Sequence, residues 1–338
     1  NRETGVTLLE FFTHNRGELG ELVLEHLFLV VISTGIAVLI GVPLGILLTR
    51  RPALSKPILG FANIMQTVPS LALFGFLIPL NIYLFQVKIV GGIGARTAIV
   101  ALVLYSLLPI IRNTFTGISN VDPAIRDAGR GMGMTDRQLL FQVELPLALG
   151  VILAGVRVAT VICVGTATIA AAIDAGGLGR YIFRGLRAND NVLILAGAVP
   201  AALIAIAADL LLGYFEKTIQ LGAAVRGKSK RLLWASAVVI LALIVGAYFF
   251  NSEAGDRIAV GSKDFTEQVI LGEIVAQAIE AKAGMQVVRR FDLGGNLAHE
   301  ALIGGEIDVY VEYTGTGLLA ILKEKPLADP QEVLRRVK

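Results

Sequence analysis

The hydrophobic pattern divides the chain at about residue 251. Long apolar segments dominate residues 25–250, whereas short apolar strands alternate with helical periods over residues 257–322. A membrane-spanning helix needs about 20 mostly apolar residues. Six segments approach or meet that requirement: 27–48, 58–80, 97–111, 147–172, 192–215 and 232–250. The pattern predicts a membrane domain over 1–231, a tether helix with a linker over 232–256, and a water-exposed α/β lobe over 257–338.

Two of the predicted spans carry internal signals. In the second span, Pro69 follows Thr67 and Val68, which predicts a kink or a broken helix because proline cannot continue the helical hydrogen bonds. In the first span, Gly41 and Gly45 stand four residues apart, and this spacing of small residues lets another helix approach closely. The third span, 97–111, is short, and we expect it to extend towards Gly91.

The positive charges of the loops predict the orientation. Basic residues follow the first, third and fifth spans, and the positive-inside rule makes that side cytoplasmic. The N-terminus and the lobe then lie on the outer side of the membrane. One glycine-rich loop, 174–179, is followed by arginines on the outer side and is a candidate for re-entering the membrane. The cytoplasmic set is Arg50, Arg51, Lys56, Arg112, Arg126, Arg130, Arg137, Lys217, Arg226, Lys228, Lys230 and Arg231, and the dissenting set is Arg180, Arg184 and Arg187.

The composition favours a membrane protein and argues against nucleic-acid binding and cysteine-based sites. The chain is 55% hydrophobic and 17% charged, below the roughly 25% charge of an ordinary soluble domain. The net charge is only +3, and the basic residues adjoin apolar segments, so they favour membrane topology over nucleic-acid binding. The single cysteine, Cys163, rules out an internal disulfide and a cysteine-based metal cluster. We predict no metal site and no catalytic residues.

The predicted loop between the third and fourth spans, 112–146, is amphipathic and carries a spaced motif. Asp127-Ala-Gly-Arg-Gly-Met-Gly133 is followed by nine residues and then by Val143-Glu-Leu-Pro146. Two short helices are expected to meet at Gly133, where the backbone must turn tightly. Pro146 can open the next helix, because the missing N–H costs little in the first turn. An ordinary amphipathic interfacial helix is the alternative interpretation.

This loop resembles the EAA loop of type I ABC importer permeases, in which Glu-Ala-Ala is followed by glycine after three residues and by Ile-x-Leu-Pro after nine more. Here aspartate, glycine and valine replace three of those residues, and the spacing is intact. The resemblance implies a coupling helix that docks on a separate ATPase chain, present in two copies and carrying the ATP and Mg²⁺. The residues implied in this coupling are Asp127, Ala128, Gly129, Gly133, Val143, Leu145 and Pro146.

Residues 222–229 have the sequence pattern of a phosphate-binding loop. Gly222-Ala-Ala-Val-Arg-Gly227-Lys228-Ser229 fits the pattern GxxxxGK[ST]. A functional P-loop follows a buried strand and opens a helix within an α/β domain. This run lies in a basic loop between two predicted spans, so we interpret Lys228 as a positive-inside residue and expect no cofactor in this chain.

The lobe is predicted to contain a parallel sheet. Strands are expected at 258–262, 286–291 and 307–313, and helices at 265–282, 297–303, 317–322 and 330–338. This alternation is typical of a parallel sheet with right-handed crossovers, which binds ligands at the carboxyl ends of its strands. All three of those ends are polar or glycine-rich and lead into helix N-termini, which attract anions such as carboxylates.

The segments 261–268 and 307–316 resemble the solute-binding proteins of osmoprotectant-uptake ABC importers, which take up glycine betaine, choline and carnitine. The resemblance implies a periplasmic-binding-protein-like lobe whose aromatic cage holds a quaternary ammonium group, a cation attracted to π-faces. Tyr313 matches a cage tyrosine, Thr316 and Lys263 match positions that hold the ligand carboxylate, and Asp264 and Asn296 are further candidates. The alternatives are structural: Tyr313 packing its own domain, and Lys263 solvated at the surface.

The whole chain is thus identified as a permease fused to a solute-binding lobe. The resemblance implies a homodimer in the lipid of the inner membrane of a bacterial cell. It imports betaines or other quaternary ammonium compounds, with ATP hydrolysis on a separate chain and no enzymatic activity of its own. Ergothioneine, a histidine betaine, is an alternative ligand. A ligand-gated channel is an alternative of another class, and a membrane enzyme using residues 222–229 is disfavoured by their context. Such binding proteins have two lobes, so we expect that the sequence is truncated.

Overall fold

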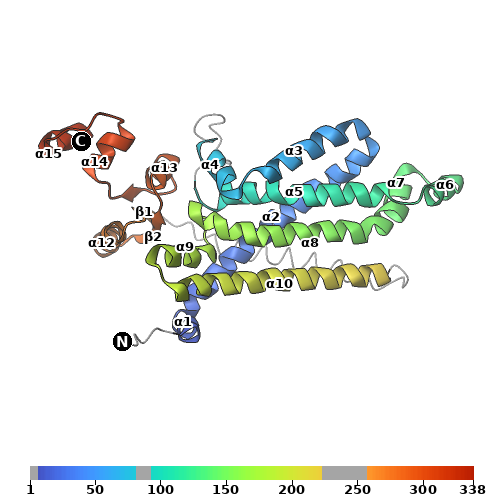
Figure 1. Cartoon of the computed structure of the whole chain (residues 1–338), viewed down its shortest axis with the longest axis horizontal. Helices are drawn as coiled ribbons and strands as arrows, with labels where there is room; N and C mark the ends of the chain where they lie inside the picture. The colour runs from blue at the N-terminus through green and yellow to red at the C-terminus, as the bar shows by residue number, and fades with distance from the viewer. Residues whose placement is uncertain (1–6, 81–92, 223–256) are drawn as a thin grey trace.

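The computed structural model describes residues 7–80, 93–222 and 257–338, which form a long helical bundle with a small α/β lobe at one end (Figure 1). The predicted span at 232–250 and residues 223–229 of the P-loop-like run lie outside the described residues. The bundle helices are α1 (Leu8–His14), α2 (Arg16–Arg50), α3 (Ser55–Thr67), α4 (Ser70–Leu80), α5 (Ala95–Ser119), α6 (Pro123–Gly131), α7 (Asp136–Leu139), α8 (Leu145–Ala170), α9 (Gly179–Ala188) and α10 (Asn191–Gly222).

Four helical segments of the described chain are long and apolar enough to cross a membrane: Arg16–Arg50, Ala95–Ser119, Asp136–Ile173 and Asn191–Thr218. Two shorter helical segments, Pro52–Thr67 and Ser70–Ile78, are bent by 101° at their break and together have the length and apolar character of a fifth span. The break at Val68 and Pro69 confirms the predicted kink in the second span. Neither half is long enough to cross a membrane by itself.

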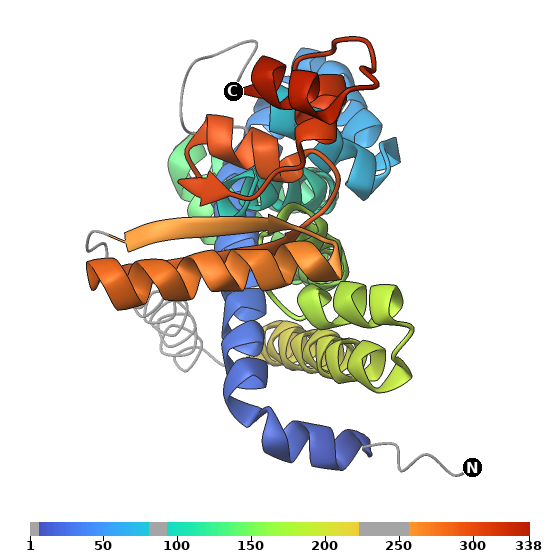
Figure 2. The same cartoon turned by 90° about the vertical axis from the view of Figure 1, so that its left-hand side faces the viewer.

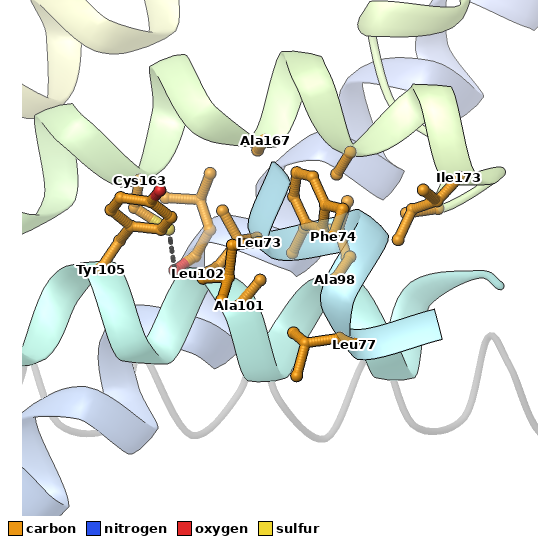
Figure 3. Close-up of a cluster of buried hydrophobic side chains, with 14 of the residues drawn as sticks. Leu73, Phe74, Leu77, Ala98, Ala101, Leu102, Tyr105, Cys163, Ala167 and Ile173 are labelled. Carbon is orange, nitrogen blue, oxygen red and sulfur yellow. Dashed lines mark hydrogen bonds between the residues drawn. The ribbon is translucent and has the colours of Figure 1, made fainter. Parts of the chain in front are cut away.

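The core of the bundle is the contact of α2, α5 and α8, with α4 wedged between α5 and α8 (Figure 3). Leu73, Phe74 and Leu77 of α4 project into this core. The predicted close approach at the first span is also present. A Cβ atom on Gly45 would lie 2.5 Å from the Cβ of Thr114, and one on Gly41 would lie 2.8 Å from a methyl carbon of Ile110. The two glycines therefore let α2 and α5 pack with their backbones close together.

The third span differs from its prediction in its boundaries. The helix continues to Ser119, eight residues beyond the predicted end at 111, and begins at Ala95. In its last turns, Asn113 donates a side-chain hydrogen bond of 2.8 Å to the carbonyl of Pro109. The first residues of the predicted coupling loop, from Arg112 to Ser119, thus belong to the span. The cytoplasmic-type loop proper starts at about Asn120.

The lobe contains β1 (Arg257–Lys263), α12 (Thr266–Ala283), β2 (Gln286–Leu293), α13 (Leu297–Gly304), β3 (Val309–Tyr310), α14 (Thr314–Thr316) and α15 (Pro330–Val337), with a π-helical turn at Gly317–Ile321. The strands are parallel, as predicted, and their order in the sheet is β2-β1-β3, with Val260 paired to Arg289 and Val309. Helix α12 packs on β1 and β2, and α13 on β1 and β3.

The third strand is shorter than the predicted 307–313. Side-chain oxygens take over backbone donors at both ends of the pairing: Asp308 accepts from the N–H of Ala259 at 2.8 Å, and Glu312 accepts from the N–H of Tyr313 at 2.9 Å. The ladder to β1 is therefore limited to two residues, and the chain turns into α14 directly after Tyr313. A helix begins at Thr314, three residues earlier than predicted.

The lobe rests on the end of the bundle where α9 lies, opposite the end occupied by α6 and α7 (Figures 1 and 2). Ile93, just before α5, is 5% exposed and packs with Leu293, Ala298 and Ile307 of the lobe. The apolar core of the lobe is therefore completed by a residue of the membrane domain.

Candidate functional site

The loop at the far end of the bundle has the two-helix form predicted for a coupling element. Helix α6 begins at Pro123, capped by Asp122, whose carboxylate accepts from the N–H of Ala124 at 2.8 Å. Helix α7 begins after Thr135, whose hydroxyl and backbone exchange hydrogen bonds with Gln138 in a capping box. Between them Gly133 has a φ of +78°, so the turn uses a backbone conformation that glycine adopts without strain.

Some of the motif residues are buried in the loop and the bundle, and others are exposed at the surface. Gly129 is buried, and a Cβ there would lie 2.8 Å from Leu139, so the missing side chain lets α6 pack against α7. Asp127 and Ala128 are exposed on α6, and Leu145 packs on the cluster of Ile118, Ala148 and Ile152. Val143 is half-buried, and Pro146 lies in the first turn of α8, as predicted.

Pro146 lies in the first turn of α8, as predicted, but the chain before it is already helical. Residues Leu140–Glu144 form a π-helical turn that joins α7 to α8, so the helical segment is continuous from Asp136 to Ile173. Proline is accommodated because the π-turn already shifts the hydrogen-bond register there. Large apolar side chains are exposed on this loop: Ile125, Met132 and Phe141, the last two at 76% and 61%.

A buried carboxylate that the sequence analysis did not predict connects this loop to the bundle. The side chain of Glu144 is 0% exposed and lies between two arginines. One oxygen forms an ion pair with Arg50 at the end of α2, and the other lies 2.8 Å from Nε of Arg126 in α6. Arg126 also donates to the carbonyl of Ile118. We call Glu144, Arg50 and Arg126 the coupling triad, because it connects α6 to both α2 and α8.

At the opposite end, the three arginines that dissent from the positive-inside pattern are all paired with carboxylates. Arg180 donates to Asp174 at 2.9 Å, and Arg184 donates to Glu18 at 3.1 Å. These carboxylate partners account for arginines at the end of the bundle where the positive-inside pattern does not predict them. The glycine-rich segment 174–179 forms tight turns against α2, with the N–H of Gly177 donating to Glu25 at 2.8 Å. That this segment re-enters the membrane stays a prediction.

The same arginine-rich helix holds the lobe. Arg187 of α9 lies 3.8 Å from both Asp264 and Asp292 of the lobe, and Arg290 of the lobe lies 3.3 Å from Asp174. These contacts surround the carboxyl ends of β1 and β2, which therefore face the membrane domain. The predicted ligand-binding residue Asp264 thus also contacts α9.

The other predicted ligand residues gather at the same edge of the sheet. Tyr313 is 41% exposed, and its hydroxyl donates to Glu267 at 3.0 Å. Burial and this carboxylate raise the pKa of the Tyr313 hydroxyl. Asn296 is exposed at the start of α13, and Thr316 is half-buried at the end of α14. Their assignment to a ligand stays a prediction.

Lys263 differs from a solvated lysine. Its side chain is 4% exposed, and Nζ lies 2.8 and 2.7 Å from the two carboxylate oxygens of Glu312. Glu312 also accepts from the hydroxyl of Tyr310 at 3.0 Å. Burial, followed by this carboxylate, raises the pKa of Tyr310. Glu312 was not predicted, although it immediately precedes Tyr313, and it places a carboxylate beside the predicted cage residue.

Comparison with known proteins divides the chain at the same place as the hydrophobic pattern. Residues 41–221 match the family model described as "Binding-protein-dependent transport system inner membrane component". Residues 256–336 match the model described as "Substrate binding domain of ABC-type glycine betaine transport system".

Related proteins and structures agree with that division. The chain is 45% identical over 205 residues to "Osmoprotectant import permease protein OsmW" of Salmonella typhimurium, covering 60% of this chain and 93% of that protein. It is 42% identical over 212 residues to "Glycine betaine/carnitine/choline transport system permease protein OpuCB" of Bacillus subtilis, covering 63% and 93%. In fold it is similar to a structure of the MetNI methionine ABC transporter, with a TM-score of 0.54, 23% identity, and coverage of 60% of this chain and 95% of that one.

Proposed function

Because the chain belongs to the family of inner membrane components of binding-protein-dependent transport systems, with a substrate-binding domain fused to it, we propose that it is the membrane and binding subunit of an ATP-driven importer for quaternary ammonium or betaine compounds. Glycine betaine, choline and carnitine are the expected ligands, since they are named for the relatives of the permease domain. The ligand-gated channel is no longer favoured, because the family is one of transport permeases.

The observation that carries the proposal is the placement of the two functional ends. The lobe lies at one end of the bundle and the two-helix loop at the other (Figure 1). An importer needs this arrangement, because ligand capture and ATP hydrolysis occur on opposite faces of the membrane. We propose that the loop is cytoplasmic and that the lobe is extracytoplasmic, in agreement with the basic residues after the first, third and fifth spans.

The exposed apolar side chains of the loop support an ATPase partner. Met132 and Phe141 are largely exposed next to the rigid Gly133 turn, and such residues favour a protein contact. We propose that two copies of this chain and two ATPase subunits form the complete importer, and that this chain itself does not hydrolyse ATP. The coupling triad would then pass movement of α6 to α2 and α8.

Uptake by cells tests the substrate proposal. Cells lacking the gene, with and without the restored full-length chain, are given radiolabelled glycine betaine, choline, carnitine or ergothioneine at high osmolarity. We expect chain-dependent uptake of at least one of the first three compounds. Uptake of ergothioneine alone would move the substrate to the histidine betaine, and chain-dependent uptake of none of the four would refute the substrate class.

The division of labour is tested separately with purified protein. The isolated chain in nanodiscs is expected to show no ATP hydrolysis above background, and the complex with its ATPase is expected to show hydrolysis that rises with the transported compound. ATP hydrolysis by the isolated chain would contradict the proposal.

A further inference from the structure

A carboxylate of the lobe lies directly against the tyrosine that is predicted to belong to the ligand cage. The hydroxyl of Tyr313 donates at 3.0 Å to Glu267, which lies in the first turn of α12. Tyr313 is 41% exposed and Glu267 is exposed as well, so a compound in solution can approach both side chains. In the part of the chain that the structure describes, Glu267 takes part in no ion pair. A negative charge without a basic partner therefore lies beside the tyrosine ring.

The backbone of Tyr313 is held by a second carboxylate. Its N–H donates to Glu312 at 2.9 Å, and Glu312 in turn forms the ion pair with Lys263. One hydrogen bond thus fixes the backbone of Tyr313, and the other fixes its hydroxyl. With both ends held, the ring keeps its position while part of its surface stays open to a ligand.

The ion pair of Glu312 also occupies the lysine that could bind an anion at this edge of the sheet. Nζ of Lys263 lies 2.8 and 2.7 Å from the two oxygens of Glu312, and the lysine side chain is 4% exposed. A ligand carboxylate could replace Glu312 only by breaking this buried pair, which would leave a buried charge without a partner. In this arrangement Lys263 is not available to a ligand carboxylate, in contrast to the role that the resemblance implies.

The charges that remain at this edge are negative. Asp264 lies 3.8 Å from Arg187 of α9, so its charge is compensated while the lobe is docked on the bundle. Glu267 has no such contact within the described chain. A ligand that reaches the face of Tyr313 therefore meets one uncompensated carboxylate and no free ammonium group.

We propose that Glu267 determines the charge preference of the lobe, which then binds cationic quaternary ammonium compounds such as choline more tightly than zwitterionic betaines. The inference rests on the proposed function and narrows its substrate class. A trimethylammonium group on the face of Tyr313 is attracted both by the ring and by the carboxylate beside it. The carboxylate of glycine betaine is repelled by the same charge and finds Lys263 already paired.

The expected size follows from the Coulomb attraction between two exposed unit charges. At about 6 Å this attraction is worth about threefold in affinity at the dielectric constant of water, and more near a protein surface, where salt in turn reduces it. An effect of about threefold to tenfold on choline binding follows. Glycine betaine gains little from Glu267, because the attraction of its ammonium and the repulsion of its carboxylate largely cancel.

Substitution of Glu267 by glutamine separates its charge from its hydrogen bond. Glu267→Gln keeps an oxygen that can accept from the hydroxyl of Tyr313 and removes the negative charge. Glu280→Gln is the matched control, because it removes the same charge about 20 Å further along α12. Its partner Arg289 keeps an ion pair with Glu273. The binding of choline and of glycine betaine to the full-length chain in nanodiscs is measured by isothermal titration calorimetry.

We expect the wild type to bind choline more tightly than glycine betaine. Glu267→Gln should weaken choline binding by about threefold to tenfold and change glycine betaine binding by less than about twofold, whereas Glu280→Gln should keep the wild-type ratio. Tyr313→Phe retains the ring and loses the hydrogen bond to Glu267, so it should weaken both compounds alike. A purely structural role of Glu267 would likewise change both affinities together and leave their ratio unchanged.

The salt dependence of the wild type supplies a test that needs no variant. Added salt should lower the ratio of choline affinity to glycine betaine affinity, because it screens exposed charges, and sucrose at the same osmolarity should not. An unchanged ratio in Glu267→Gln, tighter binding of glycine betaine by the wild type, or a ratio independent of salt would overturn the role of Glu267 and leave the importer proposal standing. A wild-type chain that binds neither choline, glycine betaine nor carnitine would instead refute the proposed substrate class.

Discussion

The coupling triad provides a prediction whose size follows from burial. Glu144→Gln keeps the shape of the side chain and removes the charge that holds Arg50 and Arg126. Removing one partner of a fully buried ion pair costs about 3–5 kcal/mol, whereas exposed pairs contribute about 0–1 kcal/mol. The carboxylate is 0% exposed, but the arginines are 37% and 23% exposed and can be hydrated when released. We therefore expect an intermediate loss of about 2 kcal/mol in the free energy of unfolding.

The single cysteine supplies the assay. Cys163 is 0% exposed in the core of the bundle, so a fluorogenic thiol reagent reports the unfolding of this domain as the thiol becomes accessible. For a domain of 150–250 residues, a loss of about 2 kcal/mol lowers the Tm by about 4–8 °C. The full chain in nanodiscs is heated at a fixed protein concentration, and the wild type and Glu144→Gln are compared.

A matched control lies in the same loop. Asp127 and Arg130 also form an ion pair, but at 4.0 Å and with side chains that are 76% and 59% exposed. Asp127→Asn should leave the Tm close to the wild-type value, because solvent screens such a pair. The double variant Glu144→Gln/Arg126→Gln should lose less unfolding free energy than the sum of its two single variants, because both substitutions remove the contact between Glu144 and Arg126. Equal, small shifts for Glu144→Gln and Asp127→Asn would refute the reasoning.

Three further predictions concern the turn, the helix contact and the lobe. Gly133→Ala, at a φ of +78° with open space around it, should cost about 1 kcal/mol, whereas Gly131→Ala in α6 should be neutral or stabilising in the same thiol assay. Gly45→Leu should prevent a stable fold, seen as immediate thiol reactivity, because even a Cβ would lie 2.5 Å from Thr114. Arg187→Ala should lower the docked fraction of the lobe by about twofold to fivefold in a fluorescence energy transfer experiment, and high salt should have the same effect on the wild type. Thiol kinetics in Gly45→Leu equal to those of the wild type would contradict the close helix contact. Equal free-energy costs for Gly133→Ala and Gly131→Ala would contradict the argument from the Gly133 turn. Docking of the lobe that does not depend on salt would contradict its ionic attachment.

The elements that the sequence predicted are those with a local signal. The spans follow from uninterrupted apolar length, the break in the second span follows from Pro69, and the parallel sheet follows from the alternation of strands and helices. The spacing of Gly41 and Gly45 predicted a close helix approach, and the structure identifies the partner as α5. The family resemblance rests on the same local signals, since both motifs are continuous in the chain.

The features that the sequence did not predict depend on residues far apart. Arg50 and Glu144 are 94 positions apart, and their contact requires α2 and α8 to be packed first. The side chain of Asp308 accepts a hydrogen bond from the N–H of Ala259, 49 positions away. The pairing of Lys263 with Glu312 likewise depends on the order of strands in the finished sheet. Side-chain partners of this kind are determined by the tertiary structure, and the hydrophobic periodicity of the sequence does not predict them.

The lobe and the bundle are parts of one polypeptide, so the ionic contacts between them can be weaker than those between separate proteins. Tethering gives the lobe an effective concentration at its docking face that can reach the millimolar range. Contacts too feeble to join two freely diffusing proteins are then sufficient to keep the lobe in place for much of the time. Because each contact is weak, departure is also fast, and a released lobe returns without a search through bulk solvent.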